Sequence, residues 1–312
     1  MHSGNALDWA MGFARSVVLG LALLFATAAA AQEHPLAGRI WAVAEERFVT
    51  EDELVELLKP ARYVLVGESH DNADHHRAQA YVVERLARAG RRPIVAFEQM
   101  DASQQAALER YVMAPGDAAG LGRAVGWSNA WPEWRFYQPI AEAALRNGLS
   151  MVAGNVTDEV ARRAMRDMGV LDAEFVARTR LNDPLPEAAH RLLERELVMM
   201  HCGMTGPVIQ MMMTAQRVRD AAFADALTRR DEGDGGVLIA GTGHTRTDFG
   251  VPWVLGKMAP GATVASLAMV EVAGPFPRAQ DYAQLYDSAR LPFDYVWFTP
   301  AAARERAGDP CR

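Results

Sequence analysis

The sequence predicts an α/β fold, with a mostly parallel central sheet flanked by helices and a helical cap or insertion. Short, continuous apolar runs recur along the chain, which is typical of parallel strands buried on both faces. Segments with helical periodicity separate these runs. Two of the runs end in the same pattern, G-x-x-H, which predicts that distant parts of the chain meet at one edge of the sheet.

Six apolar runs predict strands, and helices follow most of them. The strands are expected at 62–67, 92–98, 149–155, 236–244, 263–272 and 293–300, the last of them as a candidate edge strand. Helices are expected at 73–90 and 103–111, from about Asp158, and from Pro207 onward.

The N-terminal segment, residues 1–31, predicts a secretory signal peptide. Arg15 precedes an apolar run that ends in small residues, and cleavage is expected near Ala31. An N-terminal membrane anchor is the alternative, although the run is short for a span of roughly 20 residues. No cysteine lies near the cleavage site for lipid attachment, so a periplasmic location is expected. Residues 32–312 are expected to form a single domain with helical insertions near 113–138 and 172–231.

Charge and cysteine content limit the classes of function. The formal net charge of −7 argues against a nucleic-acid partner, which would favour a basic surface. Export would permit a disulfide between Cys202 and Cys311, but the sequence alone leaves two unpaired thiols as an equal alternative.

Four polar residues follow apolar strands and predict one shared site. Glu68 and His70 follow the first predicted strand, Glu98 ends the second, and His244 follows the fourth. Ligands of parallel sheets bind beyond the carboxyl ends of the strands, so these groups are expected in one pocket as catalytic residues. His70, His244 and Glu98 also suit a divalent metal ion, and the sequence does not separate metal chemistry from metal-free acid–base chemistry.

Polar residues of two predicted helices bear on the same pocket. His75 and His76 begin the helix after the first strand, and a solvated surface role is expected for both. Gln216 and Asp220 interrupt the apolar stripe of the helix that starts at Pro207. Because buried polar groups need partners, this pair predicts either an internal network or, as the favoured interpretation, a wall of the pocket.

Two segments are rich in large apolar side chains. A cluster of methionines near residue 200 predicts adaptable core filling or, alternatively, a flexible wall for a large flat ligand. An aromatic cluster between glycines and prolines predicts a lid-like segment that lines a pocket. The methionines are Met199, Met200, Met204, Met211, Met212 and Met213, and the aromatic residues are Trp127, Trp131, Trp134, Phe136 and Tyr137.

Several segments together resemble the ChaN-like haem-binding uptake proteins of the Tiki/TraB/erythromycin-esterase superfamily. They are "LVGESHDNADHHRAQ", "VAFEQM", "FYQPIAEAALRNGLSMVAGN", "HCGM" with "AQRVRDAAFADAL", and "IAGTGHTRTDFGVPWVL", and they span about Val64 to Leu255. The paired G-x-x-H motifs with the glutamate resemble the superfamily signature. The chain departs from the many family members that are lipoproteins, because it lacks the cysteine that carries the lipid.

The resemblance implies an exported protein of iron acquisition that binds haem non-covalently between two subunits, with a tyrosine as iron ligand. Tyr137 occupies the family's Y-x-P position and is the expected ligand, with Tyr111 and Tyr81 as alternatives. A homodimer and outer-membrane haem transport components are the implied partners. Superfamily relatives hydrolyse substrates at the G-x-x-H site, some with a metal, so a hydrolase is the alternative function. A degenerate member that only binds a partner is a third hypothesis.

Overall fold

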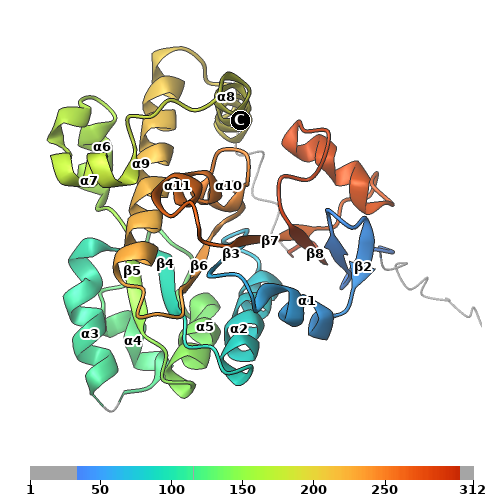
Figure 1. The fold of residues 1–312 in the computed structure, drawn as a ribbon, viewed down its shortest axis with the longest axis horizontal. Helices are drawn as coiled ribbons and strands as arrows, with labels where there is room; N and C mark the ends of the chain where they lie inside the picture. Colours follow the sequence, from blue (N-terminus) through green and yellow to red (C-terminus); the bar gives the residue numbers. More distant parts are fainter. Residues whose placement is uncertain (1–33, 115, 303–312) are drawn as a thin grey trace, which may run out of the picture. The chain divides into compact units, whose positions relative to one another are not determined.

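An eight-stranded, mostly parallel sheet forms the centre of the computed structural model, which describes residues 34–114 and 116–302 (Figure 1). The predicted signal peptide and its cleavage site lie outside these residues. The strands are β1 (Ile40–Ala42), β2 (Arg47–Val49), β3 (Tyr63–Glu68), β4 (Ile94–Asp101), β5 (Met151–Asn155), β6 (Gly236–Gly241), β7 (Val264–Glu271) and β8 (Tyr295–Thr299).

The strand order is β2-β1-β8-β7-β3-β6-β4-β5. The six strands from β8 to β5 are mutually parallel, which confirms the predicted α/β class. β1 pairs antiparallel with both β2 and β8. The expectation of an edge strand at 293–300 is therefore wrong, because β1 covers the free side of β8. β1 and β2 escaped prediction because three-residue strands carry no measurable alternation.

Helices follow the parallel strands as the alternation of apolar runs predicted. The α-helices before β6 are α1 (Glu51–Leu58), α2 (Ala73–Arg88), α3 (Gln105–Met113), α4 (Ala118–Ala124), α5 (Trp134–Arg146), α6 (Asp158–Ala164), α7 (Ala173–Thr179), α8 (Glu187–Met200) and α9 (Pro207–Arg229). After β6 come α10 (Thr242–Thr245) and α11 (Val251–Met258), and the short 3₁₀ segments are η1 (Ala102–Gln104), η2 (Met168–Val170) and η3 (Ala279–Tyr286).

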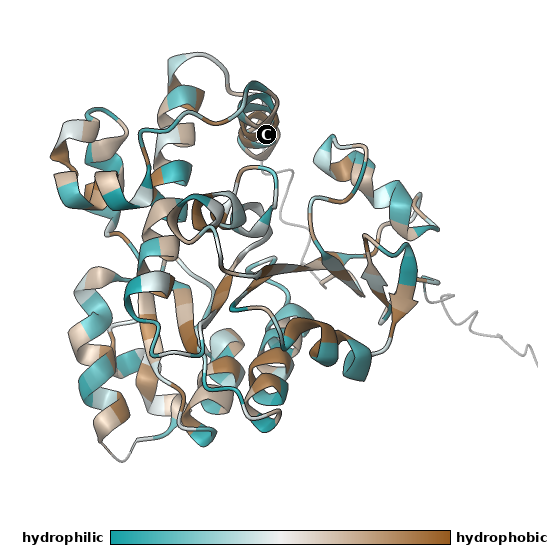
Figure 2. Cartoon of the chain, viewed as in Figure 1, coloured by the Kyte–Doolittle hydropathy of each residue, from teal (hydrophilic) through white to brown (hydrophobic). Residues whose placement is uncertain are grey.

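The sheet separates two apolar layers, because successive side chains of a strand point to opposite faces. Val64 and Val66 of β3 pack in the layer that contains residues of α1 to α5. Tyr63 and Leu65 pack in the opposite layer, against residues of α9 and α11. The central strands are coloured mostly as hydrophobic in Figure 2, whereas the helices combine hydrophobic and hydrophilic residues. Burial on both faces explains why the strands appear in the sequence as continuous apolar runs.

The two segments predicted as helical insertions do contain helices. α4 and the start of α5 lie within 113–138, and α7, α8 and α9 lie within 172–231. α9 has 23 residues and begins with Pro207, which is well suited to the first helical position. One part of α9 packs on the sheet through Phe223 and Leu227, whereas Ile209 and Met213 pack against α8. In the described part of the chain, every helix is too short or too polar to cross a bilayer.

Gly67 allows β3 to approach α10 closely, and its replacement by alanine is expected to destabilise the fold. An added Cβ would overlap Thr245 Oγ1 and would lie 3.0 Å from Thr242 Cα. Overpacking of this kind costs about 1–3 kcal/mol, which urea denaturation of Gly67→Ala would measure. Gly256→Ala is the matched control, because Gly256 lies in α11 with nothing within 4 Å of the new Cβ. A Gly67→Ala protein as stable as the control would contradict the proposed close approach.

Candidate functional site

Glu68, the last residue of β3, is a buried carboxylate surrounded by hydrogen-bond donors. Its Oε1 lies 2.6 Å from His70 Nδ1. It also accepts longer hydrogen bonds, both of 3.3 Å, from the amide of Gln99 and the hydroxyl of Tyr137. Its Oε2 is buried and has no hydrogen-bond partner among the described residues. Burial of a carboxylate oxygen without a hydrogen-bond partner lowers the stability of the fold, so this atom indicates a functional site.

Glu98 of β4 forms the second carboxylate centre of the site. Its Oε2 accepts a 2.6 Å hydrogen bond from the backbone N–H of Gly241, and its Oε1 lies 3.2 Å from His244 Nε2. The other ring nitrogen of His244, Nδ1, lies 2.6 Å from Asp220 Oδ1. The His244 ring is thus held between two carboxylates, an arrangement that fixes both its orientation and its charge.

Gly241 at the end of β6 lies where the pair of Glu68 and His70 meets the pair of Glu98 and His244, and it joins them into one site. A Cβ at this position would lie 3.2 Å from His70 Cε1 and 3.6 Å from Glu98 Oε2. The absence of that Cβ allows the His70 ring and the Glu98 carboxylate to approach the same backbone. The structure therefore brings Glu68, His70, Glu98 and His244 together at the carboxyl ends of β3, β4 and β6. Their catalytic role stays a prediction.

The charges of the site follow from this pairing. Burial would lower the pKa of His70, but Glu68 and then Glu98 outweigh it and raise the pKa to about 9. Burial also disfavours the charged form of His244, yet Glu98 and Asp220 raise its pKa to about 10. For Glu98, burial is outweighed by His244 and His70, and the pKa falls to about 2. At neutral pH the site therefore holds two protonated imidazoles around an ionised glutamate.

His75 and His76 are both buried, so the expectation of solvated surface residues is wrong. His75 Nδ1 accepts a hydrogen bond from the Ser69 backbone, and its Nε2 lies 2.8 Å from Thr299 Oγ1. His76 Nε2 lies 3.0 Å from the His70 carbonyl oxygen. The two rings therefore fix the loop that carries His70. The first turn of α2 faces the end of β8, a contact between segments too distant in the sequence to predict.

Gln216 and Asp220 of α9 both reach His244. Gln216 lines the cavity beside the site, as the favoured interpretation expected, whereas Asp220 is buried and belongs to an internal network, which was the alternative. Gln216 Nε2 lies 3.0 Å from His244 Nδ1, the atom that Asp220 also contacts. Gln99 and Asn155 were missed by the sequence reasoning. Gln99 directly follows Glu98 in β4, and Asn155 is the last residue of β5. Their amides hydrogen-bond Glu68 Oε1 and the Glu98 carbonyl. The signal that could have identified them was a polar residue next to the predicted site glutamate for Gln99 and a polar residue at a strand end for Asn155.

A cavity of about 370 Å³ opens beside this site. Glu98, Gln216 and His244 line it, and Trp131 and Arg219 lie on its wall. The Trp131 ring also packs edge-on against the His70 ring, with centroids 5.0 Å apart. The cavity therefore joins the acid–base groups to the predicted aromatic segment. Since the His70 side chain is 38% exposed, solvent reaches the site directly.

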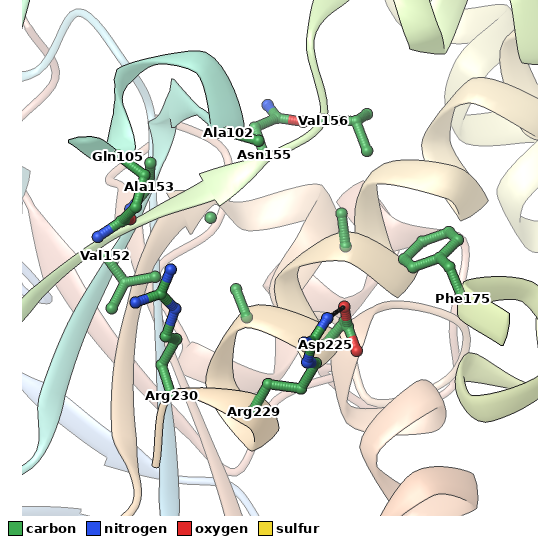
Figure 3. A pocket seen from close by; sticks show the side chains of 13 residues that line it. Ala102, Gln105, Val152, Ala153, Asn155, Val156, Phe175, Asp225, Arg229 and Arg230 are labelled. Carbon is green, nitrogen blue, oxygen red and sulfur yellow. Dashed lines mark hydrogen bonds and ion pairs between the residues drawn. The ribbon is translucent and has the colours of Figure 1, made fainter. Parts of the chain in front are cut away.

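A neighbouring cavity of about 390 Å³ lies between β5 and α9 (Figure 3). Asn155 contributes to both cavities. Asp225 lies near the guanidinium of Arg229, and Arg230 lies on the same wall. The second cavity holds none of the four predicted site residues, so the chemistry of the site belongs to the first cavity.

The residues of the site give no support to the predicted divalent metal ion. Among residues 34–114 and 116–302, no group of three or more histidine, cysteine, aspartate or glutamate side chains is arranged to hold a metal. His70 and His244 instead direct ring nitrogens at carboxylates at 2.6 to 3.2 Å. A ring nitrogen that carries a proton toward a carboxylate has no lone pair for a metal.

Tyr137, the predicted haem ligand, lies inside the protein. Its side chain is completely buried, and its hydroxyl donates to Glu68. The rings of His76 and Trp127 lie against it, with centroids 4.3 and 5.0 Å away. Burial first, and then the charges of Glu68 and Glu98, raise the pKa of the phenol, which opposes formation of a phenolate. In this conformation Tyr137 does not fit the role of an axial ligand to haem iron.

The two alternative tyrosines lie nearer the surface but are already bonded. Tyr111 donates its hydroxyl proton to the Asp117 carbonyl at 2.9 Å. Tyr81 accepts a 2.6 Å hydrogen bond from Arg85, and burial, together with Glu51, raises the pKa of its phenol. Trp127, Trp134 and Phe136 pack partly buried against the main core layer, whereas Trp131 lies at the cavity. The predicted lid-like segment is therefore mostly a core contact.

The methionines divide into a buried set and an exposed set. Met213 is buried between α8 and α9, as core filling predicts. Met199, Met200 and Met204 are 60%, 67% and 49% exposed. Large apolar side chains exposed together are uncommon on soluble proteins. Whether Cys202 pairs with Cys311 lies outside the described residues, because Cys311 is not among them.

The buried pairs of histidine and carboxylate at the ends of parallel strands define an α/β protein with a two-centre Glu/His site. The model of the family described as "Haem-binding uptake, Tiki superfamily, ChaN" matches residues 54–255, more than half of the chain. The chain belongs to this family, as the resemblance of its motifs implied.

A solved structure shows the same fold. The structure described as cofacial heme binding to ChaN of Campylobacter jejuni has a TM-score of 0.64 at 16% identity and covers 83% of this chain and 95% of that chain. The type III effector HopBA1 has a TM-score of 0.45 at 13% identity and covers 80% of this chain and 93% of that chain. A mutant of the erythromycin esterase EreC has a TM-score of 0.44 at 14% identity and covers 86% of this chain and 84% of that chain. A comparison with curated proteins found no match.

The charge state of His244 makes a testable contribution to stability. Because its pKa is raised to about 10, the folded protein retains a proton that the unfolded chain loses above about pH 6.5. This contribution is fully present below pH 6.5 and is lost as the pH rises toward 10. Thermal unfolding between pH 6 and pH 10 should show a falling midpoint in the wild type and a smaller fall in His244→Gln.

His190→Gln is the control for this measurement, because His190 is an exposed histidine of α8. Its variant should keep the wild-type pH dependence. If the unfolding midpoint falls equally with pH in the wild type, His244→Gln and His190→Gln, the ion pairs of His244 do not couple protonation to stability as expected.

Proposed function

We propose that this protein is an exported carrier that binds haem non-covalently in iron acquisition. The observation that carries the proposal is the family match over residues 54–255, which includes the G-x-x-H loops and the helices around them. Export rests on the sequence of residues 1–31. Such a carrier requires two kinds of partner. A second copy of the chain would cover the open face of haem, and outer-membrane haem transport components would exchange haem with the carrier.

An exposed apolar surface supports the proposal. Met199, Met200, Met204 and Val208 are all at least 40% exposed, and we call them the methionine surface. Haem has two large apolar faces, and the burial of each Å² contributes roughly 25 cal/mol before the cost of association. A flexible, polarisable methionine side chain adapts well to a flat ligand. The methionine surface therefore offers haem an apolar contact outside the filled core.

Tyrosine ligation is the part of the proposal that this conformation supports least. A phenolate would suit ferric iron, but the Tyr137 hydroxyl is buried and bonded to Glu68. Its use would require the displacement of the packed rings around it. Haem binding is therefore proposed for the chain without Tyr137 as the ligand.

The wild-type protein is expected to bind ferric haem at micromolar concentration. Titration of the purified protein with haemin, followed by absorbance, should give a saturable Soret shift, and denaturation should release the haem because no covalent attachment is proposed. A saturable shift of the same size with an unrelated protein of similar charge would indicate non-specific adsorption. The absence of any shift would overturn the carrier function.

A hydrolase is the second candidate function, and the geometry of His244 favours it. Its ring is oriented by Asp220 at 2.6 Å and faces the cavity beside Glu98. A protonated His244 can donate a proton to a leaving group, and Glu98 can accept one from water. The pKa of Glu98, about 2, makes it a weak base while both imidazoles remain paired with it. Substrate entry would have to separate Glu98 from a histidine before hydrolysis could proceed.

A panel of ester and peptide substrates tests this second function. If the site is hydrolytic, His244→Gln should lower turnover by about 10²–10⁴-fold, the usual contribution of a general acid or base. His190→Gln should leave turnover unchanged, because His190 lies on the exposed side of α8. Parallel assays with a chelator would show whether a metal takes part. Turnover that is equal in wild type and His244→Gln would exclude this site as its source.

A further inference from the structure

The cavity beside Glu98 and His244 has a polar wall. Small-molecule sites of roughly 300–1,000 Å³ are mostly lined by apolar side chains. This cavity, at about 370 Å³, has the volume of such a site but the opposite lining. Among the described residues that border it, Ala130, Trp131 and Val156 are apolar, and all the others have polar side chains. A ligand of this cavity would therefore be recognised mainly through hydrogen bonds.

Three amide side chains on this wall use their nitrogen atom and leave their oxygen atom without a partner. Gln99 and Asn155 donate hydrogen bonds to oxygen atoms of the two site glutamates, at 3.3 and 2.9 Å. Gln216 directs its Nε2 at His244 Nδ1, 3.0 Å away. The oxygens of Gln99 and Asn155 are buried without a hydrogen-bond partner, and none is found for the Gln216 oxygen among the described residues. Since buried polar atoms almost always have partners, these oxygens indicate that a donor is missing.

Donor groups lie on the same wall. Ser128 Oγ accepts a 3.2 Å hydrogen bond from the Ala130 N–H, so its hydroxyl proton remains able to donate. Arg219 uses one nitrogen for Asp158, and a guanidinium carries five N–H groups. The wall thus offers acceptors and donors together. A hydroxyl group matches both, whereas an ammonium group can only donate and a carboxylate can only accept.

The charges on the wall are already compensated. Glu98 pairs with His244 at 3.2 Å, and Arg219 pairs with Asp158 at 2.9 Å. Asp101 is the N-cap of η1, and its side chain accepts a backbone N–H there. Every cation among the described lining residues is paired with a carboxylate, so an anionic ligand would meet no free positive charge. This pairing favours a neutral ligand.

We propose that this cavity binds a neutral saccharide, whose hydroxyl groups bond to the amides of Gln99, Asn155 and Gln216 while a sugar ring lies against Trp131. The inference rests on the hydrolase, the second candidate function above, and names its class of substrate. The hydroxyl groups supply the donors that the amide oxygens lack. The Trp131 ring packs edge-on against the His70 ring, with centroids 5.0 Å apart. A sugar held against Trp131 therefore lies beside the acid–base groups of the site.

Isothermal titration calorimetry of the purified protein tests the class of ligand. Maltose, cellobiose and diacetylchitobiose are the neutral probes, digalacturonate is the anionic probe and glucosamine is the cationic probe. At least one neutral saccharide should bind with a dissociation constant in the micromolar to millimolar range, and more tightly than either charged probe. Binding should also change the tryptophan fluorescence. Trp131→Phe should abolish most of that change, although an aromatic ring remains for the sugar.

Gln216→Met tests the contribution of the amides. The substitution keeps the length of the side chain and removes its hydrogen bonds, so the affinity for the neutral saccharide should fall about tenfold. Gln210→Met is the matched control, because Gln210 is an exposed residue of the same helix that bonds Glu194, outside the described lining of the cavity. Its affinity should equal that of the wild type. Circular dichroism of each variant checks that the fold is intact.

The outcomes distinguish the inference from the hydrolase on which it rests. Saccharide binding without hydrolysis of the saccharide or of any ester or peptide in the panel would uphold the class of ligand and overturn the hydrolase. Hydrolysis of an apolar ester, with no binding of the neutral saccharides at millimolar concentration, would overturn the inference and leave the hydrolase in place. Tighter binding of a charged probe, or an equal loss of affinity in Gln216→Met and Gln210→Met, would also overturn the inference.

Discussion

The rest of the site depends on the burial of two glutamates at the carboxyl edge of the sheet. Glu68 and Glu98 are 2% and 4% exposed, and an unpaired carboxylate is costly at such depth. His70 and His244 compensate these charges, and the elements that carry the two rings must be positioned to within hydrogen-bonding distance. The loop after β3, the short helix α10 and the polar residues of α9 are all arranged around this requirement.

Charge compensation also explains why α9 carries polar residues on an otherwise apolar face. Asp220 is buried and contacts His244, so its place in the stripe is set by the need for a second carboxylate at that ring. Phe223 packs against the same ring, with centroids 4.9 Å apart and nearly perpendicular planes. The helix therefore acts both as a wall of the core and as a support for the site. A buried pair is not by itself evidence of added stability, because desolvation opposes it.

The sequence predicted features that recur at the same position, such as polar residues at the ends of apolar strands. It did not predict contacts between segments that are distant in the sequence. The six parallel strands follow from continuous apolar runs, and the meeting of Glu68, His70, Glu98 and His244 follows from the rule that parallel strands end at one edge. The burial of His75 could not be foreseen, because its partner Thr299 lies on β8. The burial of Tyr137 could not be predicted either, because a sequence motif specifies a residue type but not how deeply its side chain is buried.

The pairing of β1 with β8 has a consequence for how the chain reaches its native state. Ile40 lies opposite Trp297, so the first strand of the sheet is completed by the last one. Contacts between residues so far apart in sequence form late, because the entropy of closing the intervening loop must be overcome first. During synthesis, β1 and β2 therefore emerge long before the strand that holds them. This order delays completion of the sheet until the whole polypeptide is available.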